Sequence, residues 1–167
     1  MYQRVKSTGC TALAAVAAAT VFSAVPAGAV TVGQEGCTPG YWKNHTENWL
    51  ESAGSPISTE TLVTSVFTGA AGLEALEGVT LLEALQGGGG SGVDGAALIL
   101  ARAAVAAYLN AAHDDLGYPW RRFGPGRDGR PALIRTVNAA FASGDRATML
   151  ALASRLDRDN NLGCPLS

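Results

Sequence analysis

The residues best suited to chemistry lie in a segment that runs from Gly36 to His45 and reads Gly-Cys-Thr-Pro-Gly-Tyr-Trp-Lys-Asn-His. A helix is predicted over residues 41–50, and Trp42, His45 and Trp49 then fall at i, i+3 and i+7 on one face. If that face is exposed, it could stack a sugar ring or another flat ligand, with His45 as a polar contact. If it is buried, its aromatic residues anchor the N-terminal helix in the core, the common role of large rings in small secreted domains.

A second aromatic group lies in a loop predicted over residues 117–130, where Tyr118 and Trp120 are the candidate ligand contacts. This loop belongs to a basic part of the chain. Residues 102–167 hold nine arginines against six aspartates, whereas residues 30–101 hold one lysine against eight acidic residues. We favour mutual attraction between the two halves. The alternative is a basic docking face formed by Arg121, Arg122, Arg127, Arg130 and Arg135.

The two histidines raise the question of a metal site. His45 and His113, with Asp114 or Asp115, could hold zinc or iron with an open position, as in a metal-dependent hydrolase. No His-x-x-x-His or Glu-x-x-His spacing places two ligands on one helix, so the site would require His45 and His113 to meet in space. The alternative is that His113 ends a helix, where a histidine is favourable near the negative pole. No cofactor and no catalytic residue are predicted.

The first 29 residues have the three parts of a secretory signal peptide. Arg4 and Lys6 form a basic start, an apolar run of about 15 residues follows, and Ala27-Gly28-Ala29 is a small-x-small cleavage site. The run is shorter than the ~20 residues that a membrane-spanning helix needs. Cleavage after Ala29 would leave residues 30–167 as one secreted domain, with no transmembrane anchor.

The predicted mature chain keeps two cysteines, Cys37 and Cys164. In an oxidising compartment they are expected to pair and so close the two ends of the domain. Cleavage removes two of the 12 basic residues and none of the 14 acidic ones, which leaves a net charge of −4. A mildly acidic secreted domain is a poor candidate for nucleic-acid binding.

The remaining pattern predicts an all-α domain of five or six helices around an alanine-rich central helix, Asp94 to His113. The central helix is apolar apart from Arg102 and Asn110. Residues 87–92 are predicted to be a flexible glycine-rich connection. Further helices are expected from Ser58 or Thr59 to Phe67, from Thr80 to Gln86 behind a capping box, from Pro131 to Ser143, and after Asp145.

Several motifs together resemble exported bacterial proteins of unassigned function. The nine-residue opening Cys-Thr-Pro-Gly-Tyr-Trp-Lys-Asn-His, Cys37 to His45, is the most specific of them. The others are the glycines before the alanine-rich helix, Leu109 to His113, Tyr118-Pro119 and Asn160 to Leu166. The resemblance spans most of the predicted mature chain and implies an extracellular domain, with no reaction or ligand attached to it.

The expected function is therefore that of an exported, non-catalytic extracellular or cell-surface module with an unidentified extracellular or envelope partner. It would bind that partner through the Trp42/His45/Trp49 face or through the loop that carries Tyr118 and Trp120. The alternatives are a secreted metal-dependent hydrolase and a structural component of an extracellular assembly.

Overall fold

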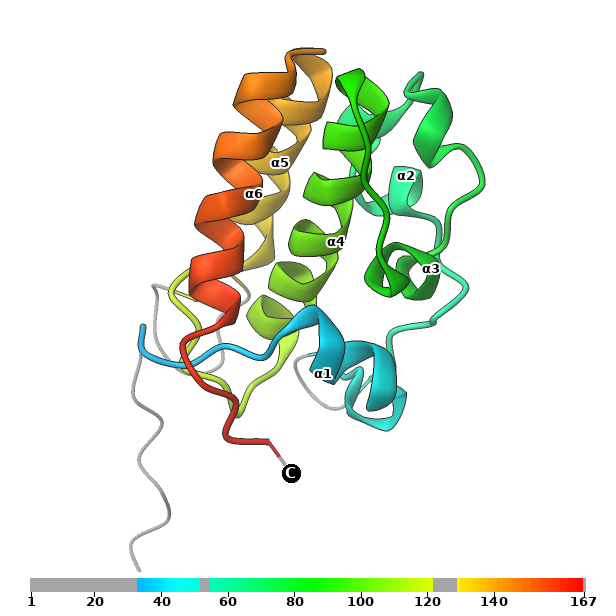
Figure 1. Ribbon diagram of the computed structural model, residues 1–167. Coiled ribbons are helices and arrows are strands. Elements are labelled where there is room, and N and C mark those ends of the chain that lie inside the picture. Colours follow the sequence, from blue (N-terminus) through cyan, green and yellow to red (C-terminus); the bar gives the residue numbers. More distant parts are fainter. Residues whose placement is uncertain (1–32, 52–54, 122–128, 167) are drawn as a thin grey trace, which may run out of the picture.

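The computed structural model describes residues 33–51, 55–121 and 129–166. These residues form helices and short 3-10 turns, with isolated β-bridges but no strand, which confirms the all-α prediction (Figure 1). The predicted signal peptide and its cleavage site lie outside the described residues. The α-helices are α1 (Pro39–Asn44), α2 (Val63–Val66), α3 (Leu81–Gln86), α4 (Gly92–Ala112), α5 (Arg130–Ala142) and α6 (Arg146–Asn160).

The alanine-rich helix α4 is the centre of the domain. It lies between the pair α5 and α6 on one side and α2 and α3 on the other (Figure 1). Every residue from Ala103 to Ala112 is buried, and the small alanine side chains let α6 approach closely. Among the described residues, α4 is the one helix long and apolar enough to cross a membrane, but 67% of its apolar window is buried inside the domain. Such burial is typical of a core helix.

Two helix starts confirm the capping signals in the sequence. At α3, the Thr80 hydroxyl accepts a hydrogen bond from the backbone N–H of Glu83, and the Glu83 carboxylate accepts one from the N–H of Thr80. At α6, the Asp145 carboxylate accepts from the N–H of Thr148 at 2.8 Å. Hydrogen bonds to the charged carboxylates lower the pKa of both residues: for Glu83 mainly the bond from the Thr80 N–H, and for Asp145 mainly the bond from the Thr148 hydroxyl, followed by that from the Thr148 N–H.

Two predicted helices are shorter than expected. The helix predicted over residues 41–50 ends at Asn44, because His45 leaves helical geometry (φ −127°, ψ 60°), and a separate 3-10 turn follows at Thr46–Asn48. The helix predicted to begin at Ser58 or Thr59 is reduced to Val63–Val66. There Leu62 forms an isolated β-bridge with Thr80, which keeps the preceding backbone extended.

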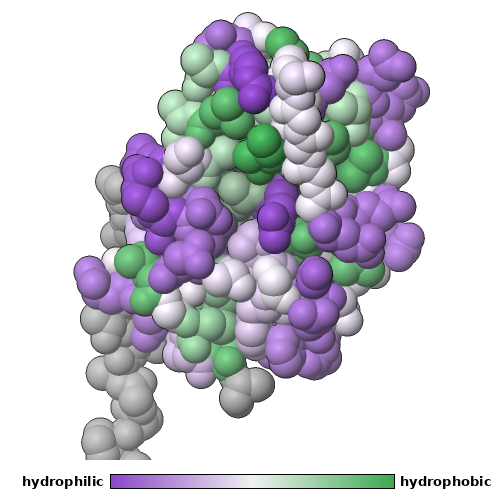
Figure 2. Space-filling model, viewed as in Figure 1, coloured by the Kyte–Doolittle hydropathy of each residue, from purple (hydrophilic) through white to green (hydrophobic). Residues whose placement is uncertain are grey.

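The glycine-rich segment, residues 87–92, is not a free connection as predicted. It runs as an extended chain across α4 and forms the pale band of Figure 2. A Cβ added to Gly95 would lie 2.2 Å from the carbonyl oxygen of Gly90, so the helix and the segment are in direct backbone contact. Arg146 of α6 also donates hydrogen bonds to the carbonyls of Gly90 and Gly92. The helix itself starts at Gly92 behind Ser91, rather than at the predicted cap Asp94.

Candidate functional site

The two cysteine motifs meet in a buried network centred on Asn110 of α4. The Asn110 Oδ1 accepts from the backbone N–H of Cys37 at 2.8 Å and from the Trp42 indole N–H at 3.1 Å. Its Nδ2 donates to the carbonyl of Cys37 at 2.9 Å. One side chain of the central helix therefore holds both backbone groups of the motif cysteine, as a neighbouring β-strand would.

Asn160, the last residue of α6, extends the network. Its Oδ1 accepts from Asn110 at 3.0 Å and from the Tyr118 hydroxyl at 2.7 Å, while its Nδ2 donates to the carbonyl of Ala103 at 3.0 Å. Burial raises the pKa of Tyr118 well above its usual value, which keeps the phenol a hydrogen-bond donor. In the described part of the chain, no buried side-chain nitrogen or oxygen lacks a partner. We call this network, Cys37, Trp42, Asn110, Tyr118 and Asn160, the clasp.

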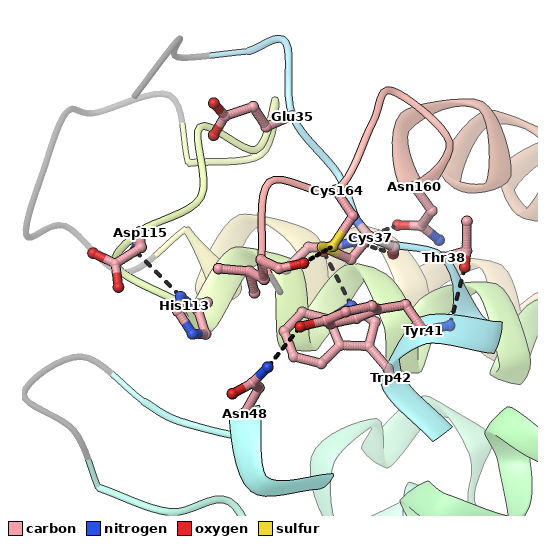
Figure 3. The surroundings of a disulfide bond; sticks show 12 residues. Glu35, Cys37, Thr38, Tyr41, Trp42, Asn48, His113, Asp115, Asn160 and Cys164 are labelled. Carbon is pink, nitrogen blue, oxygen red and sulfur yellow. Dashed lines mark hydrogen bonds between the residues drawn. A yellow bond between two sulfur atoms is a disulfide. The ribbon is translucent and has the colours of Figure 1, made fainter. Parts of the chain in front are cut away.

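The predicted disulfide closes the clasp from outside. Cys37 and Cys164 are bonded, 127 residues apart in sequence, with Cys37 fully buried and Cys164 exposed (Figure 3). Next to it Gly36 donates its N–H to the carbonyl of Gly163 at 3.0 Å. Covalent and hydrogen bonds thus join the first and last described segments at one place.

The predicted Trp42/His45/Trp49 face does not form a surface. Trp42 and Trp49 are 0% and 1% exposed, and the Trp49 indole donates to the carbonyl of Trp42 at 2.9 Å. His45 lies outside, where its ring stacks on Tyr41 at 4.3 Å and its Nδ1 lies 3.0 Å from Glu47. The two tryptophans are therefore core anchors, the second of the two interpretations.

The second aromatic group divides in the same way. Tyr118 is buried in the clasp, whereas Trp120 is half-buried. The Trp120 indole donates to Asp159 at 3.0 Å, and the guanidinium of Arg155 lies 4.9 Å from its ring centre. Trp120 is thus the most accessible of the three tryptophans, but its edge and one face are occupied.

Of the five arginines proposed for a basic docking face, two are paired within the domain, one is exposed and two lie outside the described residues. Arg121 is 4% exposed and binds the carbonyl of His113 and the carboxylate of Asp114. Arg130 pairs with Glu51 at 2.9 Å, an attractive contact between the basic and the acidic half of the chain. Arg135 is exposed on α5; Arg122 and Arg127 lie outside the described residues.

The candidate metal ligands do not assemble. His113 is buried beside Trp42, with 6.2 Å between ring centres, and its Nδ1 accepts from the backbone N–H of Asp115 at 3.2 Å (Figure 3). Burial lowers the pKa of His113, although Asp115 and Asp114 act against it. Within residues 33–51, 55–121 and 129–166, no three His, Cys, Asp or Glu side chains are placed to hold a metal ion.

A groove that sequence reasoning missed lies between α4 and α6. It has a volume of about 480 Å³ and is bounded on one side by Gly88. Figure 2 shows apolar side chains gathered beside the pale glycine band, with hydrophilic residues below them. Ile99 and Leu150 supply the apolar part of the lining, and residues 38–40 of the opening motif form the lip at the other end.

Two opposite charges line this groove. Arg102 extends from α4 and Asp157 from α6, and both are exposed. Neither side chain has a hydrogen bond or an ion pair in the described structure, and Ser154 beside them offers a free hydroxyl. The one sequence signal for this site was Arg102, the single charge in the apolar stretch of α4. Periodicity could not show that α6 would lie opposite it.

No protein-family model, no curated protein and no solved structure matches this chain. The candidate site is therefore defined by geometry: a satisfied, buried clasp that supports an open groove with two unpaired charges.

Proposed function

We propose that this protein is an exported, non-catalytic binding module that acts outside the cell or at its surface, and that its ligand occupies the groove between α4 and α6. The observation that carries the proposal is the contrast between two polar groups of residues. The clasp satisfies its own hydrogen bonds, whereas Arg102 and Asp157 face the groove without partners in the described chain. Concave, partly apolar surfaces with a small number of polar groups that can fix a ligand's orientation are the usual candidates for binding sites.

Export is supported by two independent features. The N-terminal 29 residues have the order of a signal peptide, and the disulfide between Cys37 and Cys164 is compatible with an oxidising compartment. The binding proposal is preferred to the metal-dependent hydrolase because His45 and His113 make separate local contacts. It is preferred to a purely structural role because the groove has charges that the fold itself does not use.

Binding to the producing organism tests the proposal. Labelled, oxidised protein that begins at Val30 is mixed with washed cells, and the cell-bound fraction is measured for the wild type and for two groove variants, Arg102→Gln and Asp157→Asn. The matched controls, Arg135→Gln and Asp94→Asn, remove an exposed charge elsewhere. Wild type and controls should bind, and the groove variants should not. Equal binding by all proteins, or no binding by any, would refute the proposed function.

A further inference from the structure

We infer, on the basis of the proposed function, that the ligand of the groove is an extended peptide that pairs with the backbone of Gly88 and Gly89. Its side chains would place an aliphatic group against Ile99 and Leu150 and an acidic and a basic group against Arg102 and Asp157. Four features of the described residues lead to this class of ligand.

The first feature is an open backbone edge. Gly88 and Gly89 are exposed, and neither their N–H nor their C=O groups have a hydrogen-bond partner in the described residues. Glycines also have no side chain to keep a second backbone away. Free N–H and C=O groups along an extended segment are the means by which a peptide is added as a strand.

The second feature is the order of the lining residues. Ile99 and Arg102 lie almost one turn apart on α4, a rise of about 4.5 Å. Side chains on one face of an extended peptide recur every second residue, about 6.6 Å apart. The two spacings differ by about 2 Å, which the long side chains of Arg102 and of the ligand can span. A peptide with an aliphatic residue opposite Ile99 and a charged residue two positions later, opposite Arg102, therefore fits the groove.

The third feature is the pair of charges. A ligand with only a carboxylate would be attracted by Arg102 but repelled by Asp157. A ligand with only an ammonium group would be attracted by Asp157 but repelled by Arg102. A peptide with one acidic and one basic side chain satisfies both. Charge-assisted hydrogen bonds of this kind are stronger than those between neutral groups.

The fourth feature is what the lining lacks. No aromatic side chain lines the groove in the described structure, which removes the stacking surface that a sugar ring would use. A phosphate would meet a single arginine beside an aspartate, and that carboxylate would repel a dianion. An extended peptide is the class that uses the backbone edge, the apolar end and both charges together.

A peptide library gives the first test. Acetylated, amidated octapeptides carry an aliphatic, an acidic and a basic residue at alternate positions, and a control library carries glutamine in place of both charges. Fluorescence polarisation should detect binding to the oxidised wild type from the charged library only. Arg102→Gln should weaken the best peptide about tenfold or more, the effect of losing a hydrogen bond to a charged group. A double variant, Arg102→Glu with Asp157→Lys, should prefer the peptide in which the two charges are exchanged.

Backbone methylation of the best peptide tests the strand geometry. Methyl groups on the amide nitrogens that face Gly88 and Gly89 should weaken binding about tenfold or more, whereas methyl groups on the intervening nitrogens should have little effect. Equal sensitivity at both sets of positions, or at neither, would overturn pairing with the glycine segment.

The two proposals can fail separately. Cells that bind the wild type but not the groove variants, together with no binding from the peptide library, would overturn the peptide inference alone. Absence of both kinds of binding would overturn both. If sedimentation without peptide shows a dimer that Arg102→Gln abolishes, the occupant is a second copy of this chain and the inference is wrong.

Discussion

Asn110 binds both backbone groups of Cys37, accepting from its N–H at 2.8 Å and donating to its carbonyl at 2.9 Å. The residues are 73 positions apart, and the bond pair lies beneath the disulfide that the same cysteine forms with Cys164. The opening motif is therefore held twice, once by a covalent bond and once by an amide side chain of the central helix.

Replacing Asn110 by alanine should lower the free energy of unfolding by about 3–5 kcal/mol. The substitution leaves the Cys37 N–H, its carbonyl and the Trp42 indole without their buried partner, and each such loss costs about 1–3 kcal/mol. Urea unfolding followed by circular dichroism measures the change. Asn44→Ala, at an exposed position on α1, should change stability by no more than about 0.5 kcal/mol.

Removing the disulfide should destabilise the fold but not abolish it. With Cys37 and Cys164 both replaced by alanine, we expect a loss of about 2–4 kcal/mol and an unchanged far-ultraviolet spectrum, because Asn110 still holds the Cys37 backbone. Reduction of the wild type should give the same result. Loss of helical signal at room temperature would show that the hydrogen bonds of the clasp are insufficient alone.

His113 should make stability fall as the pH drops below about 6.5, its ordinary pKa. Burial lowers the pKa of His113 in the folded state, so the unfolded chain takes up the proton first and gains stability relative to the fold as pH decreases. The slope from this group cannot exceed about 1.4 kcal/mol per pH unit. Urea titrations between pH 7 and pH 5 on wild type and His113→Gln should show the slope in the wild type only.

The effect of His113 on the free energy of unfolding falls in a different pH range from the effect of the helix caps. Glu83 and Asp145 have lowered pKa values, so their contribution is present above their ordinary values, 4.5 and 3.8, and is lost only as the pH falls through and below that range. If His113→Gln retains the full slope between pH 7 and pH 5, another group is responsible.

Gly95→Ala should destabilise α4 although alanine favours helices by about 1 kcal/mol over glycine. The added Cβ would lie 2.2 Å from the carbonyl oxygen of Gly90 and would push the glycine segment off the helix. We expect a net loss of about 1–3 kcal/mol by thermal or urea unfolding. Gly89→Ala is the matched control, because its Cβ would make an ordinary 3.5 Å contact with Ile99.

Tryptophan fluorescence should report the buried aromatic anchors. In a Trp120→Phe variant the remaining emission comes from Trp42 and Trp49, which are 0% and 1% exposed, so acrylamide should quench it only weakly. The wild type, with half-buried Trp120, should be quenched more. Strong quenching of the variant would restore the exposed interpretation of the Trp42/His45/Trp49 face.

The central helix, the capping box at Thr80 and the aspartate cap at Asp145 were predictable because each depends on neighbouring residues and a helical period. The disulfide was predictable because removal of the predicted signal peptide, with Cys10, leaves two of the three cysteines, which allow one bond. Asn110 was visible as a polar exception in an apolar helix, but its partners are 73 and 50 positions away. Only the packing of α6 on α4 determines that Asn160 meets it.

Other features were wrong or missed for the same physical reason. Spacing predicted that Trp42, His45 and Trp49 lie on one helix, but the helix ends at Asn44. The two indoles point into the core, where they donate to Asn110 and to the Trp42 carbonyl, and the helical period does not predict these bonds. The glycines at positions 88–90 were predicted to be flexible because composition cannot reveal a surface on which they lie. The groove is formed by the contact of this glycine segment with α4 and by the packing of α6 on α4, and the sequence pattern predicts neither.

The clasp also sets the order in which the protein can acquire its structure. Its bonds join residues near position 37 to residues near positions 110 and 160, so their loop-closure entropy is lost before the contacts are gained. A chain still under synthesis can form α4, but Asn110 lacks its Asn160 partner and Cys37 lacks its disulfide partner until residues 160–164 are present. Completion of the clasp therefore waits for residues 160–164, and a chain that ends before them would carry Cys37 as an unpaired thiol.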